Sequence, residues 1–202
     1  MTDRLSPTPD GLARAAELLR SGALVAFPTD TVYGLGCRAG DPEALERIFA
    51  AKRRPAEKQV AMLSASLEQA EAAGYAADDR VRSLASRWWP GPLTLILPTV
   101  AGAGPTQGFR VPDHPLTLEL IRRSGPLPTS SANRSGEPET YDADDVLVAF
   151  ADSDLLDAVL DGGRVPGGVA STVVDLSVAP ARVLRRGPIT REELAAVIGP
   201  VD

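Results

Sequence analysis

The two lysines of this chain stand close together, although every other basic residue is an arginine. Lys52 and Lys58 both lie in the segment 52–58, which also holds Arg53 and Arg54. A lysine ammonium is a compact point charge, whereas an arginine guanidinium is planar and larger. In a chain that otherwise uses arginine, a lysine therefore indicates a need for the compact cation. The alternative is a helix end whose dipole favours cations, an effect of about 0.3–1 kcal/mol. The first reading makes the cluster a candidate anion site; the second gives Lys52 little weight in stability.

Hydroxyl-bearing residues gather directly after apolar runs, where strands are expected to end. Thr29, Thr31 and Tyr33 follow the run 24–27, and the segment Thr129-Ser-Ser-Ala-Asn133 follows Leu127. Ligands of open α/β sheets gather at such strand ends. The alternative is a set of hydrogen-bonded turns, because Ser and Asn are common turn residues.

Arginines stand beside two further predicted strands. Arg110 is the only charge in 109–111, and a lone arginine there marks an edge position, a buried carboxylate partner or a ligand site. Ser171 precedes one strand and Arg185 follows another. The groups together suit phosphate or carboxylate substrates that are positioned electrostatically, and they do not suit covalent catalysis.

The elements that must position these groups follow from hydrophobic periodicity and from start and stop signals. Strands and helices are interleaved, and several strands arrive in pairs, which predicts an α/β protein with one twisted, mixed sheet flanked by helices. Neither a GxGxxG nor a GxxxxGK[ST] motif is present, so a standard Rossmann or P-loop site is excluded. We expect strands at 24–27, 60–63, 93–97, 109–111, 127–129, 155–160, 173–176 and 183–184, and helices at 10–20, 42–51, 67–73, 79–88, 115–123, 141–151 and 190–197.

Composition narrows the class of protein. The chain has 202 residues, of which 44% are hydrophobic and 24% charged, and this favours a single domain over residues 1–202. One cysteine and no apolar leader indicate a cytoplasmic protein without internal disulfides. No apolar run approaches the roughly 20 residues that span a bilayer. The net charge of −6 argues against a broad nucleic-acid surface, so any polyanion site must be local.

Seven motifs, in this order, resemble those of the YrdC-like family of L-threonylcarbamoyladenylate synthases. They are PTDTVYGLG, KRRP, WPGPLTLIL, FRVPDHP, PTSSANRSGEP, STVVDL and LRRGPI. The resemblance covers nearly the whole chain, from about residue 10 to 198, and implies that residues 10–198 are the core of a single YrdC-like domain. It implies the YrdC-type fold (α/β, or α+β in some schemes), a twisted mixed sheet with helices around a concave cationic cavity.

The resemblance also implies roles for individual residues. Lys52 and Arg54 match the K-x-R motif of the family and are the expected catalytic residues. With Ser131 and Asn133 of the S-x-N motif, and with Arg185, they are expected to bind ATP. Thr29, Arg110, Thr129 and Ser171 are expected to hold L-threonine. The adjacent residues Thr31, Tyr33 and Lys58 are weaker candidates, and no protein metal site is expected.

The family forms threonylcarbamoyl-AMP and pyrophosphate from L-threonine, bicarbonate and ATP, with Mg²⁺ carried on the ATP phosphates. The product feeds N6-threonylcarbamoyladenosine (t6A) formation in tRNA, so a downstream tRNA threonylcarbamoyl transferase complex is the implied partner. Because the chain ends soon after its last predicted helix, the resemblance is to the short, single-domain form. Two alternatives remain open: a same-fold paralogue that binds RNA or a nucleotide without synthase activity, and a carbamoyl-transfer module.

Overall fold

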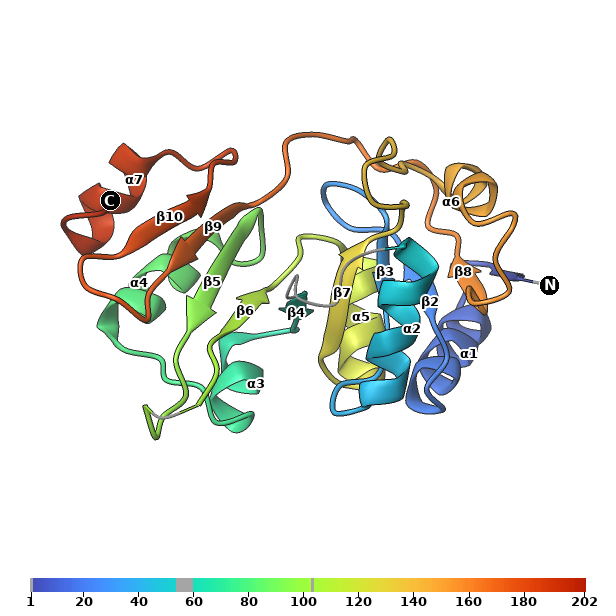
Figure 1. Cartoon of the computed structure of the whole chain (residues 1–202), viewed down its shortest axis with the longest axis horizontal. Helices are drawn as coiled ribbons and strands as arrows, with labels where there is room; N and C mark the ends of the chain where they lie inside the picture. Colours follow the sequence, from blue (N-terminus) through green and yellow to red (C-terminus); the bar gives the residue numbers. More distant parts are fainter. Residues whose placement is uncertain (1, 54–59, 103) are drawn as a thin grey trace. The chain divides into compact units, whose positions relative to one another are not determined.

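The computed structural model describes residues 2–53, 60–102 and 104–202. The chain divides by its internal contacts into two compact units, each assembled from two stretches of sequence. Unit 1 comprises Met1–Val60 and His114–Gly168, and unit 2 comprises Ala61–Asp113 and Val169–Asp202. Figure 1 shows the elements of each unit. The single domain expected over residues 1–202 stays a prediction.

Unit 1 contains a mixed sheet with its strands in the order β1-β8-β2-β3-β7. β8 runs parallel to both β1 and β2, whereas β3 is antiparallel to β2 and to β7. The strands are β1 (Asp3–Leu5), β2 (Val25–Phe27), β3 (Gly34–Gly36), β7 (Leu127–Ser131) and β8 (Ala158–Leu160).

Helices cover both faces of the unit 1 sheet. On one face, Leu35 of β3 packs in a buried cluster with Ile48 of α2 and Val146 of α6. Successive side chains of a strand point to opposite faces, and α1 contacts β2, β8 and α5 on the other side. The helices are α1 (Pro9–Arg20), α2 (Pro42–Lys52), α5 (Pro115–Ser124) and α6 (Ala143–Ala149).

Unit 2 contains a second mixed arrangement of strands, in the order β4-β6-β5-β9-β10. Its helices pack on one face, where Leu84, Leu95 and Leu194 share a buried cluster. The side chains that alternate with this cluster, including Thr94 and Arg110, therefore lie on the opposite face. The elements are β4 (Ala61–Leu63), β5 (Leu93–Leu97), β6 (Gln107–Arg110), β9 (Thr172–Asp175), β10 (Arg182–Arg185), α3 (Leu67–Ala72), α4 (Asp79–Trp88) and α7 (Arg191–Ile198).

The mixed α/β character predicted from the sequence is confirmed, and the differences are local. β3 lies where we expected a loop, and β1 precedes the first predicted element. β3 is glycine-rich for a steric reason: a Cβ at Gly36 would lie 2.8 Å from the ring of Phe27. The expected strand 155–160 is confined to β8. In the part of the chain that the structure describes, no helix combines the length and apolar character needed to cross a membrane.

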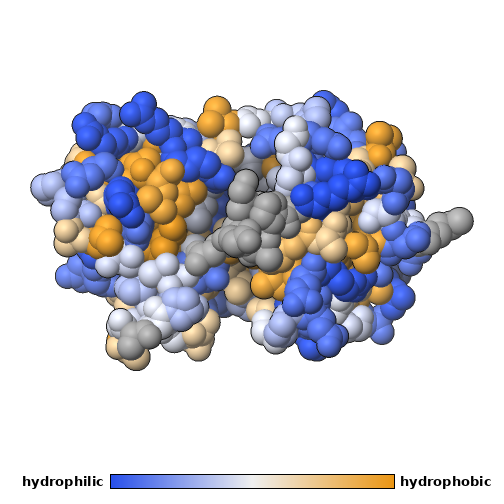
Figure 2. All heavy atoms as spheres, viewed as in Figure 1, coloured by the Kyte–Doolittle hydropathy of each residue, from blue (hydrophilic) through white to orange (hydrophobic). Residues whose placement is uncertain are grey.

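Hydrophilic side chains cover much of the visible surface of both units (Figure 2). The large apolar side chains that are exposed belong to separate elements, such as Val148 on α6 and Leu184 on β10. Charged groups and hydroxyls that are buried are therefore the more informative features, because burial of a polar group is costly unless it is hydrogen-bonded.

Candidate active site

Lys52 ends α2 on the side of the helix that faces the core. Asp41 caps the first turn by accepting a hydrogen bond from the Ala44 amide at 3.0 Å, and Pro42 follows it. The buried residues Ala44, Ile48 and Lys52 are each four positions apart and so share one stripe of the helix. Lys52 is only 2% exposed. This burial favours the reading of Lys52 as a specifically placed ammonium, and its weight in stability stays a prediction.

The ammonium of Lys52 is enclosed by the segment that follows β7. Its Nζ donates hydrogen bonds to the backbone carbonyls of Ser131 and Asn133. It also lies 3.5 Å from Ser131 Oγ and 3.4 Å from Asn133 Oδ1. In return, the Lys52 carbonyl accepts a hydrogen bond from the Ser135 amide at 3.0 Å. The structure thus brings together the lysine of K-x-R and both residues of S-x-N.

Ser131 and Asn133 are also held by each other and by the turn that follows. Ser131 Oγ donates to Asn133 Oδ1 at 2.5 Å, and Asn133 Nδ2 donates to the Glu137 carbonyl at 2.7 Å. Asn133 is buried. A hydroxyl and a carboxamide fixed beside a buried ammonium form a preorganised group that can bind an anion. Arg54 and Lys58, the other expected cations of this cluster, lie outside the described residues.

The threonines expected to bind the amino acid flank Gly34 of β3. A Cβ at Gly34 would lie 2.8 Å from Thr129 Cγ2 and 3.6 Å from Thr29 Cγ2, so glycine allows both side chains to approach. Thr29 Oγ1 donates to the Val32 carbonyl at 2.6 Å and accepts from the Thr31 amide at 3.2 Å. Thr129 Oγ1 donates to the Leu127 carbonyl at 2.9 Å. Both hydroxyls thus bind nearby backbone carbonyls, while the methyl groups of the two side chains approach the same glycine.

Tyr33 connects the loop before β3 with the segment after β8 through hydrogen bonds of its hydroxyl. Its hydroxyl donates to the Gly163 carbonyl at 2.7 Å and accepts from the Gly162 amide at 3.2 Å. The ring is fully buried, and this burial raises the pKa of Tyr33 to about 12. Thr31, the other weaker candidate, is buried beside Thr29 with 3.2 Å between their Oγ1 atoms. These contacts give both residues a structural role.

The expected site residues of unit 2 lie on the face of its strands away from the helices. Arg110 is 8% exposed, and its Nε donates to the Gly91 carbonyl at 3.1 Å. Ser171 Oγ lies 2.8 Å from Thr94 Oγ1. Arg185 donates twice to Ser171, from Nε to the carbonyl at 2.9 Å and from Nη2 to Oγ at 2.8 Å. Ser171 is therefore the centre of a hydroxyl and guanidinium group.

Strand register explains how residues far apart in sequence reach this group. Thr94 pairs with Val173, and Val173 pairs with Arg185. Leu95 pairs with Phe109 in the antiparallel β5–β6 ladder, so the next pair along is Thr94 and Arg110. Arg110 and Arg185 therefore share a row across four strands of unit 2.

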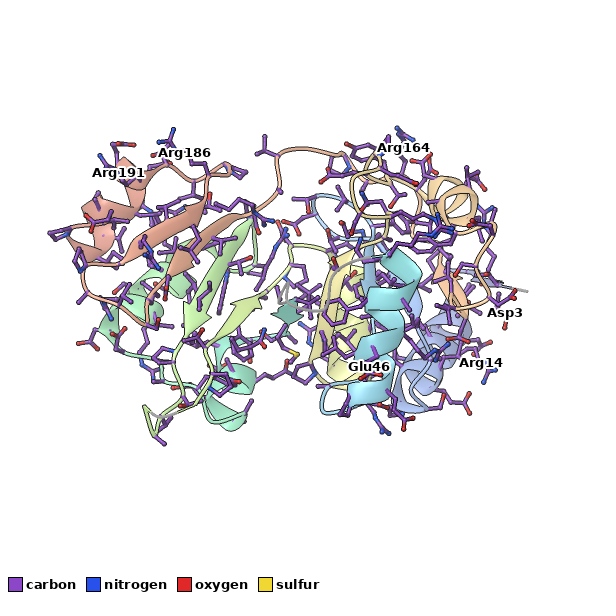
Figure 3. All side chains as sticks on the ribbon, viewed as in Figure 1. Asp3, Arg14, Glu46, Arg164, Arg186 and Arg191 are labelled. Carbon is purple, nitrogen blue, oxygen red and sulfur yellow. The ribbon has the colours of Figure 1, made fainter. Side chains whose placement is uncertain are left out.

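Sequence reasoning missed Thr94, although the pattern held a signal. Thr94 is the only hydroxyl in the apolar run Leu93–Leu97, and a buried hydroxyl needs a partner. Arg186, which directly follows Arg185 in sequence, is placed differently. Figure 3 shows the Arg186 side chain pointing outward from the end of β10, whereas Arg185 is bound to Ser171.

Fold and site together define an α/β protein with preorganised, cationic and hydroxyl-rich groups that suit anionic ligands. A family model named Sua5_yciO_yrdC and described as "Telomere recombination" matches residues 17–187. The chain belongs to this family.

Known relatives agree with that assignment. The chain is 41% identical over its whole length to threonylcarbamoyl-AMP synthase of Bacillus subtilis, of which it covers 60%. It is 42% identical, over 93% of its length, to the enzyme of the same name from Pyrococcus abyssi, of which it covers 57%. The chain thus spans about 60% of the length of these relatives.

Solved structures show the same fold. The structure of Pyrococcus abyssi Sua5 complexed with L-threonine matches all of this chain with a TM-score of 0.87 and 38% identity, and the match covers 62% of that protein. The similarity confirms the YrdC-type fold that the resemblance implied. The concave cavity expected from the resemblance stays a prediction.

Proposed function

We propose that this chain makes threonylcarbamoyl-AMP and pyrophosphate from L-threonine, bicarbonate and ATP. The observation that carries the proposal is the enclosure of the Lys52 ammonium by Ser131 and Asn133, because it joins two separate motifs expected to bind ATP. The names of the relatives support it, as does the L-threonine complex of Pyrococcus abyssi Sua5.

The proposed reaction has two steps. The amine of threonine first combines with bicarbonate to give a carbamate and water. A carbamate oxygen then attacks the α-phosphorus of ATP, and the bond from that phosphorus to the bridging oxygen of pyrophosphate breaks. Both reactants are anionic in the second step, so cations must offset their repulsion. Once the carbamate exists, the second step requires no protein base.

Residues of unit 1 are proposed to bind the nucleotide. Lys52 supplies positive charge from a fixed position, and Ser131 and Asn133 supply hydrogen-bonding groups beside it. Arg54 is proposed as the second phosphate ligand by its place in the K-x-R motif. Arg185 of unit 2 is proposed as a further nucleotide ligand, because an exposed fork of N–H donors suits phosphate oxygens.

Threonine is proposed to contact hydroxyls and one guanidinium. Arg110 would pair with the substrate carboxylate, since arginine binds carboxylates in a bidentate manner. Thr29, Thr129 and Ser171 would supply hydrogen bonds to the amino acid. The contacts of Thr31 and Tyr33 favour support of this loop over a direct contact with the substrate.

Mg²⁺ is proposed to arrive with ATP, held mainly by phosphate oxygens and water. No group of three or more His, Cys, Asp or Glu side chains that could hold a metal occurs within residues 2–53, 60–102 and 104–202. When bound, the ion would withdraw charge from the phosphates and favour the departure of pyrophosphate.

The product is proposed to pass to a tRNA threonylcarbamoyl transferase complex in the cytoplasm. A mixed carbamic–phosphoric anhydride is reactive towards amines, so a protein that transfers the carbamoyl group to adenosine must follow. The net charge of −6 makes an extended tRNA surface on this chain an unfavourable arrangement.

The proposal is tested by incubating the chain with ATP, bicarbonate and labelled threonine. We expect pyrophosphate release that depends on threonine, together with a labelled adenylate detected by mass spectrometry. Pyrophosphate release that is independent of threonine, or none at all, would contradict the proposal. Binding of ATP without any such release would instead identify a same-fold nucleotide-binding protein.

A further inference from the structure

Lys52 and Asn133 are each followed by an arginine, and both arginines bind the same carboxylate. Arg53 Nη2 donates to Asp152 Oδ2 at 3.0 Å, and Arg134 Nη2 donates to Asp152 Oδ1. Asp152 lies shortly after α6, about a hundred residues from Arg53 in sequence. One side chain therefore connects the end of α2, which carries Lys52, with the segment that encloses the Lys52 ammonium.

Arg134 binds the C-terminal end of α6. It is only 6% exposed, and its Nε donates to the Ala149 carbonyl at 3.0 Å. Its guanidinium carbon lies 5.9 Å from the centre of the Phe150 ring. The last carbonyls of a helix lack partners within the helix and carry partial negative charge, so they favour a cation. The end of α6 thus anchors the segment 131–135.

Arg53 closes α2 in an uncommon conformation. Its φ of 50° lies in the left-handed region, which is unfavourable for a residue with a side chain. Its amide donates to the Ala50 carbonyl at 3.0 Å, which ends the helix directly after Lys52. Glycine is the usual residue at such a position, so the choice of arginine is consistent with a use for its side chain.

We propose that Asp152 is a positioning residue of the proposed ATP site. It acts through Arg53 and Arg134, and it holds the end of α2 and the segment 131–135 at a fixed separation. Lys52, Ser131 and Asn133 then keep the geometry in which they meet the phosphates. Misplacement by about 1 Å can lower the rate of an enzyme roughly a hundredfold, so such a tie matters although it does not touch the ligand. This inference rests on the proposed function.

The test compares Asp152→Asn with Asp154→Asn. Asp154 is also exposed and lies two residues away, and no ion pair of Asp154 is found among the described residues. Both variants remove one negative charge, but only Asp152→Asn breaks the ion pairs with Arg53 and Arg134. For Asp152→Asn we expect the KM for ATP and the Kd for ATP to rise roughly fivefold, with the KM for threonine unchanged. Asp154→Asn should match the unaltered protein.

A double-mutant cycle with Arg53→Gln sharpens this test. Arg53 is exposed, so the variant keeps the fold even where substitution of the buried Arg134 prevents folding. We expect Arg53→Gln alone to raise the KM for ATP. In the presence of Asp152→Asn it should raise this KM little further, because both variants break the Arg53–Asp152 ion pair.

Two results would overturn the inference. One is an ATP affinity of Asp152→Asn equal to that of Asp154→Asn. The other is an equal rise in KM for ATP and for threonine together with a lower melting temperature, which would indicate general loss of stability. If the unaltered protein releases no pyrophosphate, the proposed function fails. The Kd for ATP in the two variants then still decides the role of Asp152.

Discussion

Lys52 of unit 1 and Arg185 of unit 2 carry the same charge but are held in opposite ways. Lys52 is 2% exposed and is enclosed by two backbone carbonyls and the S-x-N side chains. Arg185 is exposed on β10 and binds Ser171 with two N–H groups of its fork. The lysine is part of the framework of its unit, whereas the arginine is attached to the surface of its unit.

The difference shows why one cation was kept as lysine. A compact ammonium can be surrounded by carbonyl oxygens within a single turn of chain, and a planar guanidinium of greater size cannot occupy that space without moving the backbone. At β10 a guanidinium fits instead, because the carbonyl and the hydroxyl of Ser171 offer two acceptors side by side to Arg185. Loss of Lys52 should therefore affect both function and stability, and loss of Arg185 chiefly function.

Replacement of Lys52 is expected to give the largest effect. Lys52→Ala should lower threonine-dependent pyrophosphate release about a hundredfold or more, because a fixed charge is removed from the site. It should also lower the free energy of unfolding by roughly 1–3 kcal/mol, since the buried carbonyl of Asn133 and the partly buried carbonyl of Ser131 lose a donor. Activity assays and urea denaturation measure the two effects separately. Near-normal activity would contradict the role assigned to Lys52, and unchanged stability would contradict its structural weight.

Replacement of Arg110 is expected to affect threonine more than ATP. Arg110→Gln should raise the KM for threonine roughly tenfold, because the proposed bidentate pair with the carboxylate is lost. Arg110→Lys should recover only part of the affinity. Steady-state kinetics with each substrate varied in turn gives both constants. Arg182→Gln, on the exposed strand β10, is the control, and equal effects of the two glutamine variants would count against the assignment.

Replacement of Arg185 is expected to give a smaller effect that is confined to ATP. Arg185→Gln should raise the KM for ATP a few-fold and lower the free energy of unfolding by about 1 kcal/mol, because its two hydrogen bonds to Ser171 are lost. Its neighbour Arg186 points outward (Figure 3), so Arg186→Gln is a matched control with the same loss of charge. If both variants raise the KM equally, the effect is one of net charge and not of a specific contact.

Tyr33 gives an expected effect on stability alone, which is seen only in alkali. Burial raises the pKa of Tyr33 to about 12, above the ordinary value of 10. The folded state therefore holds the phenolic proton more tightly than the unfolded state. This contribution to stability is complete below pH 10 and is lost as the pH rises through about 12.

The control is Tyr33→Phe, which has no phenolic proton. Its free energy of unfolding should fall less steeply between pH 10 and pH 12 than that of the unaltered protein. Parallel pH curves from urea denaturation of the two proteins would show that Tyr33 titrates alike in the folded and unfolded states. That result would contradict the raised pKa of Tyr33 in the folded protein.

Several features of the site were predictable because they depend on local sequence. The apolar run before Pro28 predicted β2, and the Asp41-Pro42 start predicted α2. The spacing of Ala44, Ile48 and Lys52 also held the signal for a buried lysine, which the sequence analysis did not use. The mixed sheet followed from strands that arrive in pairs.

Other features depend on partners that no local pattern names. β3 forms because Gly34 and Gly36 let Phe27 and Thr129 approach, and a glycine-rich segment by itself predicts a loop. The link from Arg53 through Asp152 to Arg134 joins three distant segments. Likewise, Thr94 gains its role only when β5 pairs with β9.

The sequence by itself determined which chemical groups this protein carries and which short elements present them. Hydrophobic period, caps and turn residues act over a few positions, and so they can be seen in one stretch of chain. The tertiary structure alone decided which cation is buried and which hydroxyls meet. Strand register and helix packing set those distances, and they join residues far apart in sequence: Thr94 and Ser171 are 77 positions apart, and Lys52 and Asn133 are 81.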